Sequence, residues 1–108
     1  MKILIDIGHP AHILYFKNFA SYFIRKGNDV LFTCREKEVV VDLLDFLGFD
    51  YKSIGKPYKT IVGKIKGLIL FDIRLFNISK TFKPDIFLSA GSIYASHASF
   101  FFRRPHIT

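Results

Sequence analysis

The spacing of short apolar runs along this chain constrains its fold more than any other feature. Candidate strands are apolar runs at residues 3–7, 30–34 and 86–88, a weaker run at 49–54 and a last one from 105. Segments with helical spacing separate them, at residues 11–26, 40–47, 61–80 and 93–103. Near-continuous apolar runs that alternate with helices are typical of parallel sheets with right-handed crossovers. The sequence therefore predicts an α/β fold, a Rossmann-like doubly wound parallel sheet of about five strands in the order 3-2-1-4-5.

Length and composition indicate one domain over residues 1–108. Half of the residues are hydrophobic, which is ample material for a core. Cys34 is the single cysteine, so no internal disulfide can form, and no cysteine and histidine cluster has zinc spacing. We expect no metal and no cofactor. No apolar stretch approaches the roughly 20 residues that a membrane span needs, and no export signal precedes the first strand, so we expect a cytoplasmic protein.

The chain is basic, with 16 Lys and Arg against 9 Asp and Glu and a net charge of +7. Such a charge favours anionic partners. Residues 52–83 carry many of the cations among apolar residues: Lys52, Lys56, Lys59, Lys64, Lys66, Arg74, Lys80 and Lys83. This region could rest on an anionic membrane surface as a peripheral contact, or it could be a solvated helix face. No nucleic-acid recognition motif is present, so nucleic acid is not an expected partner.

In doubly wound sheets, ligands bind beyond the carboxyl ends of the strands where the strand order reverses. The first such loop lies in IGHPAH, residues 7–12. Gly8 can adopt a positive φ, and Pro10 favours an extended His9. The start of the next helix then attracts phosphate or carboxylate and favours a neutral imidazole, which suits His12 as a general base. Alternatively, either histidine only caps the helix or packs.

The second loop follows the fourth strand, at residues 89–92. Ser89, Gly91 and Ser92 offer hydroxyls and open backbone to a ligand, although a plain strand-to-helix turn would look the same. His97 and His106 are weaker candidates. Neither a Walker loop nor a GxGxxG fingerprint occurs, so neither an NTPase nor an ordinary dinucleotide-binding domain is supported.

Two segments together resemble a known family. These segments are MKILIDIGHPAHILYFKNFASYFIRKGNDVLFTCREKE and KPDIFLSAGSIYASHASFFFRRPHIT, strongest at IGHPAH and PDIFLSAGS. They resemble the N-terminal half of a prokaryotic family of domains of unknown function that is related to B-fold glycosyltransferases and to UDP-N-acetylglucosamine 2-epimerases. The resemblance spans essentially the whole chain.

The resemblance implies roles for both loops. The first loop is similar to that of the lipid-linked N-acetylglucosamine transferase, whose terminal histidine falls on His12, with Gly8 and His9 lining the cleft. Ser89, Gly91 and Ser92 fall on the loop that faces the acceptor. In the epimerases a catalytic aspartate stands where this chain has Ser92, which counts against epimerisation.

The family relatives have two domains, and the second holds most contacts to the nucleotide-sugar. The resemblance therefore implies that residues 1–108 are an N-terminal, acceptor-side fragment that is inactive alone, with a nucleotide-sugar and a small acceptor as partners of the complete protein. Two alternatives remain open: a non-catalytic nucleotide- or phosphate-binding module, and an epimerase-like protein.

Overall fold

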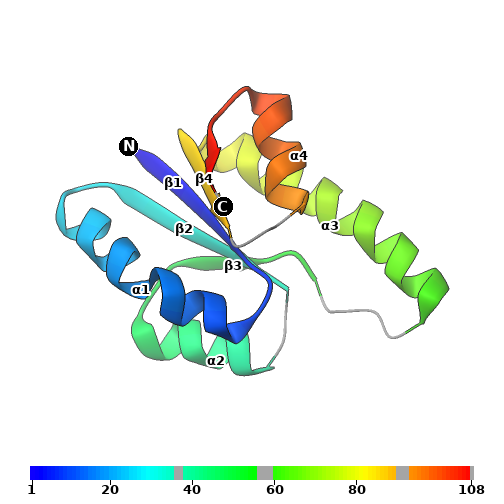
Figure 1. Cartoon of the computed structure of the whole chain (residues 1–108), viewed down its shortest axis with the longest axis horizontal. Coiled ribbons are helices and arrows are strands. Elements are labelled where there is room, and N and C mark those ends of the chain that lie inside the picture. The colour runs from blue at the N-terminus through cyan, green and yellow to red at the C-terminus, as the bar shows by residue number, and fades with distance from the viewer. Residues whose placement is uncertain (36–37, 56–59, 90–92, 108) are drawn as a thin grey trace.

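The computed structural model describes residues 1–35, 38–55, 60–89 and 93–107. Five strands alternate with four helices (Figure 1). In chain order they are β1 (Lys2–Ile7), α1 (Pro10–Arg25), β2 (Asp29–Cys34), α2 (Glu38–Leu47), β3 (Tyr51–Ser53), α3 (Ile61–Phe82), β4 (Ile86–Ser89), α4 (Ile93–Phe102) and β5 (His106–Ile107).

The five strands form one sheet in the order β3-β2-β1-β4-β5, and every pair is parallel. This is the predicted topology, and the prediction of a doubly wound α/β fold is confirmed. β1 lies at the centre because its KILIDI run is buried along nearly its whole length. The strand order reverses between β1 and β4, so their carboxyl ends bound the switch point at which such folds bind ligands.

The helices cover the two faces of the sheet in pairs, α1 with α2 on one side and α3 with α4 on the other (Figure 1). Strand alternation divides the core accordingly. Ile3, Ile5 and Ile7 pack with Ile13 and Phe16 of α1 in one cluster. Leu4, Phe71, Leu75, Phe87 and Ala95 share the other. The sheet is thus apolar on both faces, which is why its strands read as continuous apolar runs.

Local signals end the helices close to where the sequence predicts. Gly27 and Gly48 have φ values of +88° and +74° directly after α1 and α2. α3 is capped by Thr60, whose Oγ1 accepts a hydrogen bond from the Gly63 N–H at 2.9 Å. α3 continues two residues beyond the predicted end at Lys80, because the left-handed cap that terminates it is Lys83.

Candidate functional site

The two loops predicted to form a site follow neighbouring parallel strands. β1 and β4 pair in register, with Asp6 opposite Ser89 at their carboxyl ends. The first loop follows β1 directly and carries Gly8, His9 and His12. It therefore lies at the same edge of the sheet as Ser89, the last residue of β4. Gly91 and Ser92 lie outside the described residues.

His9 is the N-cap of α1. Its backbone is extended, and its Nδ1 accepts a hydrogen bond from the Ala11 N–H at 3.1 Å. Pro10 occupies the first turn, where a missing N–H is tolerated. The capping role that the sequence left open for His9 is therefore present, and its ring centroid lies 6.0 Å from that of His12.

His12 closes the first loop. The Gly8 N–H donates to His12 Nδ1 at 3.3 Å. A nitrogen that accepts a hydrogen bond carries no proton, so the neutral ring in this arrangement holds its proton on Nε2. Burial lowers the pKa of His12, and the charges of His9 and Arg35 lower it further, whereas Asp6 acts in the opposite direction. The expected neutral imidazole thus has burial, rather than the helix dipole, as its main cause.

Gly8 leaves room for a neighbouring side chain, which the sequence did not reveal. Among the described residues the glycines with positive φ are Gly27, Gly48 and Gly55, so the expectation of a positive φ at Gly8 is wrong. Instead, a Cβ on Gly8 would overlap the guanidinium of Arg35. Arg35 follows β2 and reaches across to the loop that begins α1. Close approach of the flexible end of Arg35, and not backbone twist, is what a Cβ at this position would disturb.

Beneath the loops, polar side chains cross the carboxyl edge of the sheet in strand order, from β2 through β1 and β4 to β5. Thr33 Oγ1 donates to Asp6 Oδ1 at 2.9 Å. Ser89 Oγ lies 2.7 Å from His106 Nε2. Asp6 is only 1% exposed, and Thr33 and Ser89 are fully buried. We call Thr33, Asp6, Ser89 and His106 the polar row.

His106 links the polar row to open space. It lines a cleft of about 710 Å³ with Ser96, Ser99, Phe100, Phe101, Arg103 and Arg104. Burial lowers the pKa of His106, and the Asp6 carboxylate partly opposes this. Sequence reasoning ranked His106 last, and it passed over Asp6 and Arg35. Asp6 did leave a signal, because a carboxylate inside an otherwise apolar strand is unusual.

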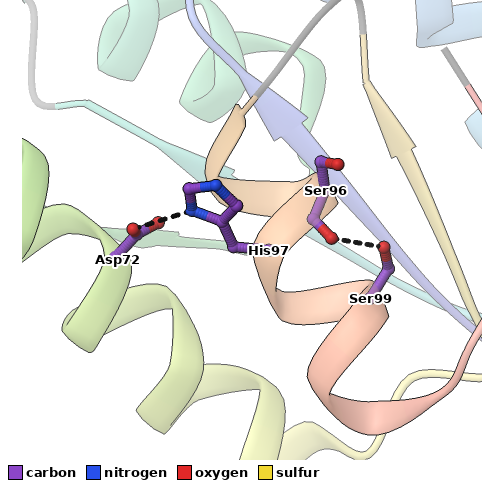
Figure 2. Close-up of polar contacts among 4 residues, drawn as sticks. All are labelled: Asp72, Ser96, His97 and Ser99. Carbon is purple, nitrogen blue, oxygen red and sulfur yellow. Dashed lines mark hydrogen bonds and ion pairs between the residues drawn. The ribbon is translucent and has the colours of Figure 1, made fainter.

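His97 lies on the side of α4 that faces α3 (Figure 2). Figure 2 shows its ring turned toward Asp72 of α3, with Nδ1 2.9 Å from Asp72 Oδ2. In the same view Ser99 Oγ donates to the Ser96 carbonyl at 2.8 Å. The His97 side chain is 63% exposed. The pair borders a cavity of about 280 Å³ between α3 and α4, lined also by Ile73, Phe76, Ala98 and Phe101.

Two further searches covered only the described parts of the chain. There, no group of three or more His, Cys, Asp or Glu side chains could hold a metal ion. In those same segments, no helix has both the length and the apolar character needed to cross a bilayer.

Solved structures share this fold at low sequence identity. MurG from Acinetobacter baumannii matches with a TM-score of 0.79 and 13% identity, over 98% of this chain and 33% of its own. UDP-GlcNAc 2-epimerase from Neisseria meningitidis, bound to UDP-GlcNAc, matches with a TM-score of 0.74 and 18% identity, over 98% and 31%. The glycosyltransferase VinC, in complex with dTDP, matches with a TM-score of 0.76 and 15% identity, over 98% of this chain and 33% of its own. The chain thus spans about a third of the length of these structures.

These likenesses establish a Rossmann-like domain of the glycosyltransferase-B type. No curated protein matches the sequence. A family match is more specific than the fold, and it extends over residues 1–108, including both loops and the polar row. The chain belongs to the family described as protein of unknown function (DUF354).

Proposed function

We propose that this chain forms the acceptor side of a glycosyltransferase-like protein that uses a nucleotide-sugar and is completed by a second domain. The observation that carries the proposal is His12, a histidine with lowered pKa at the switch point of a glycosyltransferase-B-type sheet. Coverage of only a third of each related structure supports a further domain. Gly8, His9, Ser89, Gly91 and Ser92 are proposed to line the acceptor pocket.

The proposed step is acceptor deprotonation by His12. The acceptor hydroxyl gives its proton to the ring, its oxygen bonds to the anomeric carbon of the sugar, and the nucleoside diphosphate leaves with the electron pair of the broken C–O bond. A base needs an unprotonated nitrogen, and in the present geometry that nitrogen is Nδ1. The acceptor therefore competes with the Gly8 N–H for Nδ1, so proton uptake breaks the bond between Gly8 and His12.

The test is a transfer assay on the complete gene product. Release of nucleoside diphosphate from candidate UDP- and dTDP-sugars is measured with a panel of acceptors, for the unaltered protein and for H12N. Loss of general-base catalysis should lower kcat at least about 100-fold. H97N is the matched control, because His97 lies on the α3 side and should leave transfer unchanged. Transfer that survives H12N at full rate would remove His12 as the base.

The same samples separate the alternatives. An epimerase-like protein would interconvert the sugar of the nucleotide-sugar without any acceptor, which NMR of the sugar detects. A non-catalytic module would bind UDP or phosphate in calorimetry, yet show neither transfer nor epimerisation. Tight binding of nucleotide by residues 1–108 alone would contradict the acceptor-side assignment.

A second proposal concerns the outward face of α3, which we propose contacts an anionic membrane surface. Val62, Ile65, Ile69 and Ile73 follow each other at helical spacing and are 50–70% exposed. Phe71 and Leu75 are buried on the opposite side. Surface helices normally present polar residues outward, so this apolar stripe calls for a covering surface. Two exposed cations of α3 lie at helical spacing from this stripe: Lys66, four residues after Val62, and Lys80, seven residues after Ile73.

Vesicle sedimentation tests this contact. Binding to vesicles rich in phosphatidylglycerol should exceed binding to phosphatidylcholine vesicles and should weaken with salt. The double variant I69S/I73S should release the protein, because it removes apolar area from the stripe. F46S is the matched control, since Phe46 is 86% exposed on α2, on the other side of the sheet. Equal binding by both variants would overturn the proposal.

A further inference from the structure

We infer that Asp6 is a positioning residue whose buried carboxylate lies at the carboxyl edge of the sheet, between the segments that carry His12 and His106, and stabilises the protonated form of each ring, and that His106 is a second titratable residue of the site. The geometry behind this inference is that of the polar row. Its relevance to catalysis rests on the proposed function.

The polar row places one carboxylate between two histidine-bearing segments. Asp6 is opposite Thr33 of β2 on one side and opposite Ser89 of β4 on the other. Thr33 holds one carboxylate oxygen at 2.9 Å. Ser89 in turn holds the ring of His106 at 2.7 Å. Asp6 on β1 and His106 on β5 are therefore separated by a single strand, β4, which carries Ser89.

The side chains of the polar row leave the sheet on the same face. Side chains alternate along a strand, so Asp6 shares the face of Leu4, and Ser89 shares that of Phe87. Leu4 and Phe87 both pack in the cluster with α3 and α4. His12 begins on the opposite side, with α1. Asp6 and His106 thus share a face at the carboxyl edge of the sheet, whereas the Asp6 charge acts on His12 from the other face.

His12 is opposed by burial, by His9 in its own loop and by Arg35 after β2, while Asp6 of β1 favours its protonated form. His106 is opposed by burial, and again Asp6 favours the protonated form. Two cations that follow α4, Arg103 and Arg104, line the same cleft as His106. Without Asp6, burial and the remaining charges would act alone and make both rings weaker bases. A base must retain enough basicity to accept a proton near neutral pH.

Keeping a carboxylate 1% exposed is unfavourable for folding unless polar partners compensate. An apolar residue would suit this position near the carboxyl end of β1 better for packing alone, as its neighbours Ile5 and Ile7 show. Buried charges near titratable groups are common at functional sites. At Asp6, the charge favours the protonated forms of His12 and His106.

NMR titration of D6N provides the test, and it needs neither substrate nor transfer activity. Asn has the size of Asp and can accept the Thr33 hydrogen bond, but it carries no charge. The pKa of His12 and the pKa of His106 should both fall, because the charge that favours their protonated forms is lost. D72N is the matched control, because Asp72 pairs with His97 between α3 and α4, and both titrations should stay as in the unaltered protein. A pKa that stays or rises at either histidine in D6N would overturn the inference.

A measurement on the unaltered chain excludes misfolding of the variant as the cause. The ¹³Cγ shift of Asp6 should change at two pH values, which match the titration of His12 and that of His106. Absence of either inflection would contradict the shared carboxylate. In the complete, active protein, D6N should also move the acid limb of the pH–rate profile to lower pH, whereas a purely structural Asp6 would lower the rate at every pH alike.

Discussion

Gly8 affects the pKa of His12 through a third residue, Arg35. The missing Cβ of Gly8 lets the guanidinium approach the loop, and the positive charge helps to keep the His12 ring neutral. The glycine therefore acts through the space that it leaves. Sequence spacing does not predict this effect, because the pairing of β1 with β2 is what brings Gly8 and Arg35 together.

Two substitutions at this contact should raise the pKa of His12. R35Q removes the charge, and G8A displaces the flexible end of Arg35 from the loop. G8A should change the free energy of unfolding by about 1 kcal/mol or less, because Gly8 has no positive φ and the displaced atoms can move. The pKa is read from the Hε1 resonance of His12. R25Q, at the last turn of α1, is the control, and an unchanged His12 titration in R35Q would refute the role of Arg35.

At the element scale, local sequence patterns predict most of the strands and helices. Buried parallel strands read as apolar runs, and Gly27 and Gly48 mark helix ends, so the order of elements and the sheet topology could be predicted. The third strand shortens to Tyr51–Ser53 because it pairs with a single neighbour, β2. An edge strand receives less support from pairing than a central one.

The candidate site was predictable only in part, for a physical reason. His9, His12 and Ser89 follow strand ends, and strand ends can be found from local patterns. The roles of Asp6 and His106 depend on which strands become neighbours and which side chains then meet. His106 lies 17 residues from its partner Ser89. Such contacts appear only when the sheet is assembled.

The turn after β3 gives a prediction at this scale. Gly55 has a φ of +118°, and a Cβ there would meet Arg74 and lie 3.2 Å from Phe71 Cε1. Arg74 also donates to the Ile54 carbonyl at 2.9 Å. G55A should therefore lower the free energy of unfolding by about 3 kcal/mol, through backbone strain and crowding together.

Urea unfolding measures this loss, and G48A is its control. Gly48 also has a positive φ, but nothing lies within 4 Å of the position that its Cβ would occupy. Backbone strain alone should make G48A cost about 1 kcal/mol. If G48A proved as costly as G55A, contact between β3 and α3 at this turn would not be what requires glycine.

At the scale of the whole molecule, the two proposed sites lie on different parts of the fold. The carboxyl edge gathers polar side chains from β2, β1, β4 and β5, while the outer face of α3 presents apolar side chains to its surroundings. Mutations at one of these surfaces should therefore leave the other intact. H97N and F46S serve as controls because His97 on α4 and Phe46 on α2 belong to neither surface.

The two half-buried histidines, His12 and His106, should make stability depend on pH. His12 and His106 have pKa values below the ordinary value in the folded chain. As pH falls through about 6.5, the unfolded chain binds protons at these positions before the folded chain does, so unfolding becomes more favourable. The stabilisation is fully present above this pH. It is lost progressively as pH falls toward the folded-state values. The urea midpoint should accordingly be lower at about pH 5.5 than at about pH 7.5.

The variant H12N/H106N locates the origin of this dependence. Asn cannot take up a proton in this range, so the fall in midpoint should shrink markedly, whatever the variant does to stability at neutral pH. D6N should act in the opposite direction. Without the carboxylate both folded-state pKa values fall further, so the difference in proton binding between unfolded and folded chain grows and the pH dependence steepens. A wild-type midpoint that does not change with pH, or an equal fall in H12N/H106N, would show that these two rings do not carry the effect.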